Sequence, residues 1–347
     1  MNLPSHRVRR WLPLLLAAAM LPCAAMPPVG EAPFLDQRGG FDLNRREIQD
    51  FVSSMVTRYG FSRAALLETL ADAEPQARIL ELIARPAERV LPWWRYRSNF
   101  LNTARIEAGA AFWAEHRATL ARAEQQTGVP AAYVVAIIGV ETSYGRVTGT
   151  WRALDALMTL GFDYPPRAPF FRSELEQLLL LARDEGFDPE QLRGSYAGAL
   201  GPPQFMPSSY RRYAVDADGD GRRDLLRDWD DVIVSVANYF KGHGWSAGLP
   251  VLLEASSDAD TFAKLDFRNL ELNETLGALR ARGVSFTSAL PDATPAMLLP
   301  AELESGPNVR IGLANFKVIT QYNRSIRYAM AVHDLAADIT RRTVAGS

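Results

Sequence analysis

The chain has 347 residues, of which 48% are hydrophobic and 22% charged, and these values are typical of a globular protein rather than a disordered one. The length is enough for two or three packed units with sizeable cores. The 38 basic and 40 acidic side chains give a net charge of −2. This balance argues against nucleic acid as a partner, because a nucleic-acid-binding surface needs an excess of positive charge.

The first 25 residues have the pattern of a secretory signal peptide. Three arginines (Arg7, Arg9 and Arg10) precede an apolar run at residues 11–21, and small residues follow at 23–25. The apolar run is too short for a permanent membrane span. Cleavage after residue 25 would remove the three arginines, leaving 35 basic against 40 acidic residues and a net charge of −5. We therefore expect the protein to be exported.

Cys23 is the only cysteine, and it decides between two forms of the exported protein. As the lipid-attachment residue of a lipoprotein, it would tether the mature chain to a membrane. Pro22 disfavours this, since small residues usually stand before a lipidated cysteine. Cleavage after Ala25 would instead remove the thiol, so that core packing alone must hold the mature chain without disulfides. The sequence favours a soluble protein, with lipid anchoring through Cys23 as the alternative.

Two amphipathic segments predict a helical N-terminal domain at residues 32–128. Residues 44–56 and 102–123 each place apolar side chains at the 3.6-residue spacing of one helix face. Between them, residues 92–97 alternate aromatic and basic side chains (PWWRYR). We interpret this cluster as a patch that joins domains, in preference to the wall of a sugar groove.

Residues 129–250 predict a second unit built from helices at 130–141, 171–185 and 231–241. Thr127 or Gly128 can cap the first of them, and Pro130 fits its first turn, where a missing N–H costs nothing.

The pattern changes again in residues 251–347. Short strands are expected at 297–300, 309–313 and 316–320, followed by a helix at 326–340. The predicted fold class is therefore α+β and predominantly helical, with the strands in a small C-terminal part.

Glu141 is the most informative single residue. It follows eight residues, 133–140, that carry no charge. An apolar site raises the pKa of a carboxyl group, because burial disfavours the ionised form. A carboxyl group that stays partly protonated near neutral pH suits a general acid. The alternative is a glutamate at a helix end that simply reaches water.

Residues 194–210 contain three glycines, three prolines and three serines, which excludes a regular helix or a central strand. We expect a long shaped loop of the kind that often carries function. Gln204 has a donor and an acceptor for an acetamido group or sugar hydroxyls. Phe205 and Met206 offer apolar faces for a sugar ring. The alternative is a tightly folded structural turn.

The segment from residue 216 resembles the start of an EF-hand calcium loop, with carboxylates at positions one, three and five and glycine at six: Asp216, Asp218, Asp220 and Gly221. Arg222 at position seven would contribute its backbone carbonyl. Arg227 stands at position twelve, where a bidentate glutamate is expected. Asp228, Asp230 and Asp231 follow, so a longer loop can supply the last carboxylate. The alternative is a solvated acidic turn.

Three of these segments resemble the B-type lytic murein transglycosylases: residues 135–142, 194–210 and 235–240. The resemblance extends over nearly the whole mature chain, as far as residues 322–330. It implies a lysozyme-like catalytic core at 129–250, a C-terminal part at 251–347 that completes the groove, and a structural calcium ion. It also implies cleavage between N-acetylmuramic acid and N-acetylglucosamine in peptidoglycan, without water, leaving 1,6-anhydromuramyl ends.

The same resemblance implies roles for individual residues. Glu141 would be the catalytic acid and then base. Groove positions would be Ser195, Gln204, Phe205, Met206, Tyr239 and Tyr322. Arg167 matches one of two basic groove residues, whereas Pro166 replaces the other. The calcium ligands would be Asp216, Asp218, Asp220, Arg222 and Asp231, with the choice between Asp230 and Asp231 left open by one extra residue in the loop.

Two other functions compete with this one. A hydrolytic lysozyme would use Asp155 or Asp163 to place a water molecule, and a non-catalytic cell-wall binding protein would use Glu141 only structurally.

The resemblance also implies a periplasmic location, because the glycan lies there. Peptidoglycan strands are the expected partner, nucleic acid is not, and other cell-wall enzymes are candidate protein partners.

Overall fold

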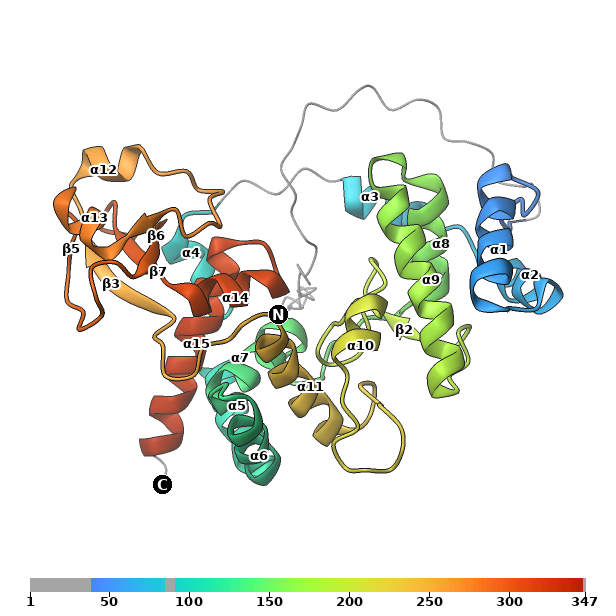
Figure 1. The fold of residues 1–347 in the computed structure, drawn as a ribbon, viewed down its shortest axis with the longest axis horizontal. Helices are drawn as coiled ribbons and strands as arrows, with labels where there is room; N and C mark the ends of the chain where they lie inside the picture. The colour runs from blue at the N-terminus through green and yellow to red at the C-terminus, as the bar shows by residue number, and fades with distance from the viewer. Residues whose placement is uncertain (1–38, 85–90, 346–347) are drawn as a thin grey trace, which may run out of the picture.

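The computed structural model describes residues 39–84 and 91–345 (Figure 1). The signal peptide and Cys23 lie outside these residues. The helices are α1 (Arg46–Tyr59), α2 (Arg63–Ala71), α3 (Ala77–Ala84), α4 (Trp93–Arg97), α5 (Thr103–Glu115), α6 (Arg117–Thr127), α7 (Ala131–Thr142), α8 (Ala153–Asp163), the 3-10 helix η1 (Pro165–Arg167), α9 (Ala168–Glu185), α10 (Pro207–Tyr213), α11 (Trp229–Gly242), α12 (Ala259–Ala263), α13 (Leu276–Ala281), α14 (Ala314–Tyr322) and α15 (Ile326–Ala345). The strands are β1 (Trp151–Arg152), β2 (Arg193–Gly194), β3 (Leu252–Ser256), β4 (Glu274–Thr275), β5 (Ser285–Phe286), β6 (Pro295–Pro300) and β7 (Val309–Gly312).

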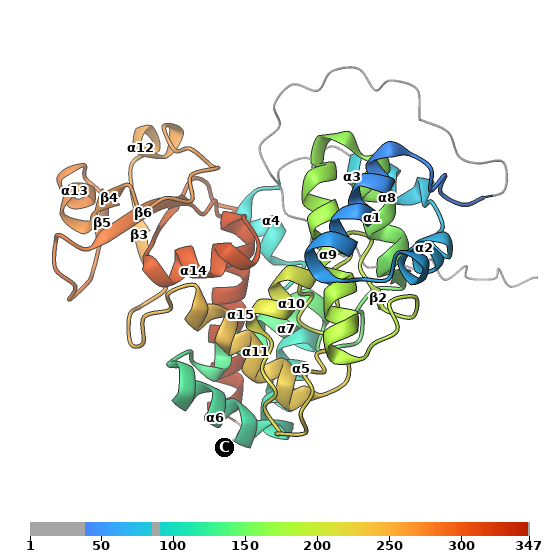
Figure 2. The same ribbon diagram turned by 45° about the vertical axis from the view of Figure 1, so that its right-hand side comes forward.

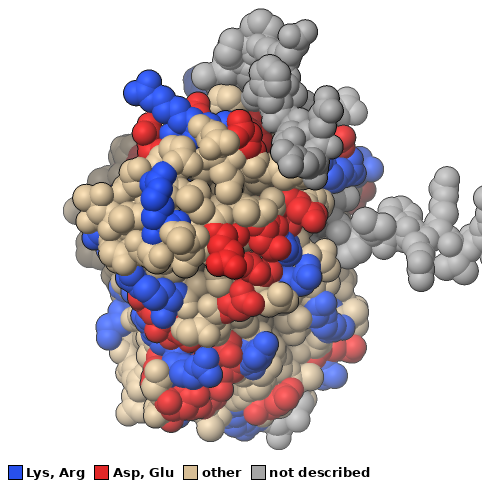
Figure 3. All heavy atoms as spheres, turned by 90° about the vertical axis from the view of Figure 1, so that its right-hand side faces the viewer, with Lys and Arg blue, Asp and Glu red and all other residues tan. Residues whose placement is uncertain are grey.

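The fold is α+β and mostly helical, which confirms the predicted class. A five-stranded antiparallel sheet in the order β4-β6-β7-β3-β5 lies at one end of the molecule, and α1, α2, α3, α8 and α9 lie at the other (Figures 1 and 2). Between these ends stand α5, α6, α7, α10, α11 and α15. On the face that carries α1 and α2, acidic and basic side chains are interspersed (Figure 3).

Helix α7 forms the centre of the middle region. Its side chains are apolar almost all round, and a helix of that kind must be buried on every side. Accordingly α7 packs against α5, α6, α11 and α15. The charge-free residues 133–140 lie within this helix, and most of them are buried. The carboxyl end of α7 is thus held between elements that lie far apart in the sequence.

A tyrosine ring fixes the distance between α5 and α7. The hydroxyl of Tyr144 donates to the carbonyl of Arg105 at 2.9 Å, so the ring lies across both helices. A Cβ atom on Gly109 of α5 would stand 2.4 Å from the Tyr144 hydroxyl oxygen, and one on Gly139 of α7 would stand 2.6 Å from it. Both positions therefore need glycine, because any side chain would displace the ring.

The helices of the N-terminal segment pack against different parts of the molecule. Helix α3 packs against α8, whereas α4 packs against α15, and α5 and α6 pack against α7. The aromatic-basic cluster at residues 92–97 contacts a distant part of the chain, since the buried Trp93 donates its backbone N–H to the carboxylate of Glu302. The division of the chain at residues 128 and 250 stays a prediction.

Three local predictions were wrong. Residues 316–320 lie in α14 and not in a strand, because the short apolar run is buried on a helix that packs on β7 and α15, and periodicity cannot distinguish such a run from a strand. The predicted helix at 102–123 is two helices that meet at His116. The first helical N–H of α7 is capped by the carboxylate of Glu124, not by Thr127 or Gly128, since Gly128 terminates α6 in a left-handed conformation.

The other expected helices near residues 44–56, 171–185, 231–241 and 326–340 are present as α1, α9, α11 and α15, and the strands at 297–300 and 309–313 as β6 and β7. Within residues 39–84 and 91–345, no helix has the length and apolar composition that a membrane span requires.

Replacement of Gly139 by alanine should lower the free energy of unfolding by about 1–3 kcal/mol, the usual cost of overpacking a core. The added methyl group meets the ring of Tyr144 at distances of 2.6–2.9 Å. Thermal unfolding followed by circular dichroism measures the effect. Gly161→Ala is the matched control, because the atoms nearest to its methyl group would belong to Arg172, at 3.2 Å or more. Equal melting temperatures for the two variants would contradict the role of the ring.

Candidate active site and metal loop

Glu141 lies in the last turn of α7, where the backbone turns sharply. Ser143 and Tyr144 follow with φ angles of 51° and 62°, a left-handed conformation that side chains seldom adopt. The hydroxyl of Thr142 fixes this turn, since it donates to the carbonyl of Pro202 at 2.9 Å and accepts from the N–H of Gly145 at 3.0 Å. The end of α7 is therefore tied directly to the loop that follows β2.

The carboxyl group of Glu141 is buried, with 4% of the residue exposed. Burial raises its pKa to about 7, and the hydroxyl of Tyr328, which donates to Oε1 at 2.5 Å, opposes this shift. Among the described residues no donor contacts Oε2. A carboxyl group in this state is partly protonated at neutral pH and has one oxygen available for a substrate.

Four tyrosines surround the carboxyl group. Burial is the first cause that raises the pKa of Tyr96, Tyr239, Tyr322 and Tyr328, and the negative charge of Glu141 raises each of them further, after Tyr213 in the case of Tyr239. They come from α4, α11, α14 and α15, so the site is assembled from both ends of the chain. Sequence reasoning placed Tyr239 and Tyr322 here, set aside a sugar-groove role for the cluster that contains Tyr96, and gave no role to Tyr328. Nothing in the local pattern of α4 or α15 distinguishes those two from core aromatic residues.

The loop between β2 and α10 is tightly folded. Ser195 accepts hydrogen bonds at its hydroxyl from the N–H groups of Ala197 and Ala199, at 3.3 and 3.1 Å. Gln204 adopts a φ of 51° and donates its amide nitrogen to the carbonyls of Thr148 and Gly201. Its Oε1 meets no donor among the described residues and is therefore available as an acceptor. Residues 207–210, predicted as loop, form the start of α10 with Pro207 in its first turn.

The aromatic residues of this loop and its neighbours form one stacked group. Phe205 is 2% exposed, and its ring lies 5.4 Å from that of Tyr239 and 5.8 Å from that of Tyr322. Its faces are thus covered, so Phe205 supports the two tyrosine rings rather than presenting a surface for a sugar. Met206, directly after it, is half-buried. The hydroxyls of Tyr239 and Tyr322 donate to the backbone carbonyls of Gln321 and Pro203.

Arg167 lies on η1, before α9. Its guanidinium stacks over the rings of Phe170 and Phe171, at 4.6 and 5.0 Å from their centroids. Burial lowers the pKa of Arg167, and Tyr164 and Tyr196 oppose that shift. No carboxylate pairs with Arg167 within the described residues, so its charge remains available to a ligand.

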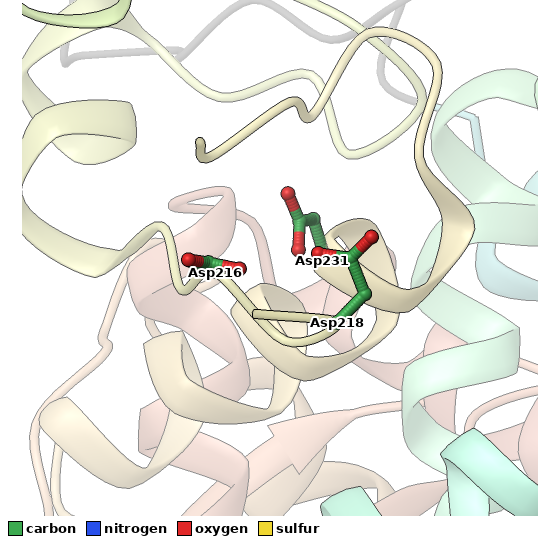
Figure 4. A group of neighbouring side chains, drawn as sticks. All are labelled: Asp216, Asp218 and Asp231. Carbon is green, nitrogen blue, oxygen red and sulfur yellow. The ribbon is translucent and has the colours of Figure 1, made fainter. Parts of the chain in front are cut away.

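The acidic loop brings three carboxylates together. Asp216, Asp218 and Asp231 each direct an oxygen to within 4.8 Å of the other two (Figure 4). Backbone N–H groups of the loop hold them: Gly219 and Gly221 donate to Asp216, and Ala217 and Asp224 donate to Asp231. Hard cations such as Ca²⁺ take oxygen ligands in loops of this kind, so the cluster could hold a metal ion.

Asp230 and Asp231 point in different directions on α11. Asp231 points into the acidic loop and is 2% exposed. Asp230 points to α6, where Thr119 and Arg122 donate to its carboxylate. Asp220 lies outside the three-residue cluster, although its carboxylate accepts from the backbone N–H of Arg222 at 2.8 Å. The side chain of Arg222 donates to the carbonyl of Glu185, which leaves only its backbone carbonyl for the loop.

The two carboxylates considered for a hydrolytic mechanism are both used in structural contacts. Asp155 pairs with Arg152 at 2.7 Å and accepts from the N–H of Glu74 at 3.0 Å. Asp163 pairs with Arg45 at 2.5 Å. Each holds part of the N-terminal segment against α8, so neither is free to place a water molecule.

Comparison with known proteins identifies the family. Residues 44–337 match the Transglycosylase SLT domain. The chain belongs to this family. Membrane-bound lytic murein transglycosylase B of Escherichia coli (strain K12) is 43% identical over 310 residues, which cover 86% of this chain and 84% of that protein. The enzyme is therefore a lytic murein transglycosylase that acts on peptidoglycan, and the predicted family and activity are confirmed.

Solved structures share the fold. Soluble lytic transglycosylase SltB1 from Pseudomonas aeruginosa superimposes with a TM-score of 0.82 and 49% identity, covering 87% of this chain and 100% of that one. Escherichia coli Slt35, solved in complex with calcium, gives 0.80 and 42%, covering 88% and 96%. Pseudomonas aeruginosa SltB3, solved in complex with NAG-NAM-pentapeptide, gives 0.73 and 31%, covering 85% and 79%.

In the Tyr328→Phe variant, the decline of activity on the alkaline side should occur at a higher pH than in the wild type. The hydrogen bond from Tyr328 stabilises the ionised form of Glu141, so its loss raises a pKa that is already about 7. The acid form would then persist to higher pH. The pH dependence of kcat/KM on purified peptidoglycan measures this. An alkaline decline of kcat/KM at the same pH as in the wild type, or at a lower pH, would contradict the role of this hydrogen bond.

Proposed function

We propose that Glu141 is the single catalytic residue, acting first as acid and then as base. In its protonated form it donates to the glycosidic oxygen as the bond to the muramic acid C1 breaks, and the substrate's own acetamido oxygen stabilises the positive charge at C1. The resulting carboxylate then takes the proton from the C6 hydroxyl, whose oxygen attacks C1. The products are a free 4-hydroxyl end and a 1,6-anhydromuramyl end, with no water consumed.

The observation that carries this proposal is the state of the carboxyl group. Its pKa of about 7 allows the group to lose a proton and regain it within one cycle near neutral pH. Ordinary glycosidases need a second carboxylate to attack or to activate water. Here Asp155 and Asp163 are paired with arginines, which supports a mechanism with one carboxylate over a hydrolytic one.

The groove around Glu141 supports recognition of an N-acetyl sugar. The free Oε1 of Gln204 suits an acetamido N–H, and the hydroxyl of Ser195 keeps its own proton to donate, since it accepts from two backbone N–H groups. Tyr239 and Tyr322 line the apolar wall, with Phe205 behind them and Met206 beside them. Arg167, without a carboxylate partner, suits a negative group of the glycan peptide. SltB3, with its NAG-NAM-pentapeptide ligand, supports a peptide-bearing glycan as the partner here as well.

Glu141→Gln should reduce cleavage of peptidoglycan by about 100-fold or more, because glutamine keeps the shape but cannot exchange a proton. Mass spectrometry of the released fragments, scored for anhydromuramyl ends, measures cleavage. Wild-type turnover by the variant would contradict the assignment.

The same variant should be more stable at pH 8 than the wild type. The folded-state pKa of Glu141, about 7, lies above its ordinary value of 4.5, so the stability that its protonated form provides is complete below pH 4.5 and is lost as pH rises through 7. The loss is roughly 3 kcal/mol, at about 1.4 kcal/mol for each pKa unit. Melting temperatures of both proteins at pH 5 and pH 8 test this. The difference between the variant and the wild type should be larger at pH 8 than at pH 5, in favour of the variant.

We also propose that the acidic loop holds a structural Ca²⁺ ion. Asp216, Asp218 and Asp231 would supply carboxylate oxygens, with Asp220 and the carbonyl of Arg222 completing the set. The calcium complex of Slt35 supports this choice of metal. The loop lies between α10 and α11, so a cation there would fix both helices and relieve the repulsion among the carboxylates.

Calcium should raise the melting temperature of the wild type, since an ion that binds only the native state stabilises it. EDTA should reverse the increase. Asp231→Asn should abolish the response, whereas Asp230→Asn should keep it, because Asp230 pairs with Arg122 instead. Two variants with the same response would refute the ligand assignment, and a wild type that is insensitive to both calcium and EDTA would refute the ion.

We propose, finally, that the mature enzyme is soluble in the periplasm after cleavage near Ala25. The relative from Escherichia coli is named membrane-bound, whereas SltB1 is named soluble, so both forms exist in relatives of similar identity. Pro22 before Cys23 supports the soluble form for this chain. Cell fractionation and mass spectrometry of the mature N-terminus should find an unmodified residue after the signal peptide. A lipid-modified Cys23 in the membrane fraction would overturn this proposal without affecting the chemistry.

A further inference from the structure

Arg327 lies at one edge of the active site. It is in the first turn of α15, directly before Tyr328, whose hydroxyl donates to Glu141. Tyr96 interacts with both charges: burial and then the charge of Glu141 raise its pKa, the guanidinium of Arg327 opposes the shift, and the resulting pKa is about 12. Arg327 is therefore near the tyrosines that line the catalytic carboxyl group.

The guanidinium of Arg327 lacks hydrogen-bond partners. Its side chain is 17% exposed, yet no acceptor in the described part of the chain meets any of its five donors, and its Nε is fully buried. The nearest anion is Glu302, whose Oε1 lies 3.7 Å from Nη2, beyond hydrogen-bond distance. The other oxygen of Glu302 accepts from the backbone N–H of Trp93.

Two other arginines at similar depth, Arg310 and Arg45, form closer ion pairs. Arg310, with 12% of its side chain exposed, contacts Asp334 at 2.8 Å and Glu254 at 2.9 Å. Arg45, with 20% exposed, contacts Asp163 at 2.5 Å. Buried polar groups in native proteins are normally hydrogen-bonded, because an unmet donor costs free energy. The donors of Arg327 depart from this rule within the described residues, and they do so beside the active site.

An exposed aromatic side chain lies beside Arg327. The ring of Phe267, which is 38% exposed, lies 6.0 Å from the guanidinium carbon, and the exposed Trp94 is linked to Glu302 through a backbone hydrogen bond. Burial lowers the pKa of Arg327, with Glu302 and Tyr96 opposing, so the charge is held at some cost. A planar guanidinium in such a place matches a carboxylate, which can accept two parallel hydrogen bonds from it.

We propose that Arg327 is a specificity-determining residue that binds a carboxylate of the peptide attached to the muramic acid. This inference rests on the proposed role of Glu141, because Arg327 directly precedes Tyr328, whose hydroxyl donates to that carboxyl group. In intact peptidoglycan the lactyl group of muramic acid is used in an amide bond, so free carboxylates belong to the peptide. Arg167 stacks on Phe170 and Phe171 at the start of α9, a different edge of the enzyme.

The test measures binding of the disaccharide NAG-NAM-pentapeptide by isothermal titration calorimetry. This ligand has no bond of the type that the enzyme cleaves, so the result does not depend on Glu141 being the catalytic acid. Three probes are compared: the natural pentapeptide, the same ligand with its carboxylates converted to carboxamides, and the peptide-free disaccharide, whose lactyl carboxylate is free. The wild type should bind the natural ligand about ten-fold or more tightly than the carboxamide, as expected for hydrogen bonds to a charged group.

Arg327→Gln should abolish that preference, Arg327→Lys should keep part of it, and the matched control Arg324→Gln, an exposed residue of the same charge, should keep all of it. A wild type that binds both ligands equally would overturn the proposal without any variant. So would an Arg327→Gln protein that retains the preference, or one that weakens binding of both ligands equally. Tighter binding of the peptide-free disaccharide than of the carboxamide, lost in Arg327→Gln, would assign the contact to the lactyl carboxylate and overturn the peptide assignment.

Discussion

The burial of one carboxyl group organises this enzyme. Glu141 lies in the last turn of a helix whose other side chains are almost all apolar, and burial raises its pKa to about 7 against the opposing effect of the Tyr328 hydrogen bond. Water would restore the ordinary pKa, so each element around α7 contributes by keeping water away or by aligning the group. The ring of Tyr144 fixes α5 against α7, Thr142 ties the helix end to the loop before α10, and α15 brings Tyr328 onto Oε1.

The site is assembled from elements that are distant in sequence. Tyr96 comes from α4, Tyr239 from α11, and Tyr322 and Tyr328 from the last two helices. The paired aspartates on α8 have a different task, since they hold the N-terminal segment through Arg45 and the backbone N–H of Glu74. The acidic loop joins α10 to α11, the helix of Tyr239. A cation there would therefore act on the active site through a rigid helix, without touching the substrate.

The sequence predicted those features whose signal is local. The charge-free run before Glu141, the alternating aspartates from Asp216 and the long amphipathic helices are visible as patterns, and the structure contains them. Other features depend on contacts between remote segments. No local pattern distinguishes Tyr328 from a core tyrosine, and adjacent residues such as Asp230 and Asp231 differ only through the helix that turns one inward. The apolar run at 316–320 was taken for a strand because a short buried segment fits both periodicities.

The most direct test of this account is the pKa of Glu141 itself. The enzyme can be labelled with carbon-13 at the glutamate δ-carbon and titrated by nuclear magnetic resonance, with Glu141→Gln used to assign the signal. The account predicts a midpoint near pH 7, displaced from the other glutamates by burial. A midpoint near the ordinary value of 4.5 would mean that water reaches the carboxylate, and the proposed acid–base role of Glu141 would lose its physical basis.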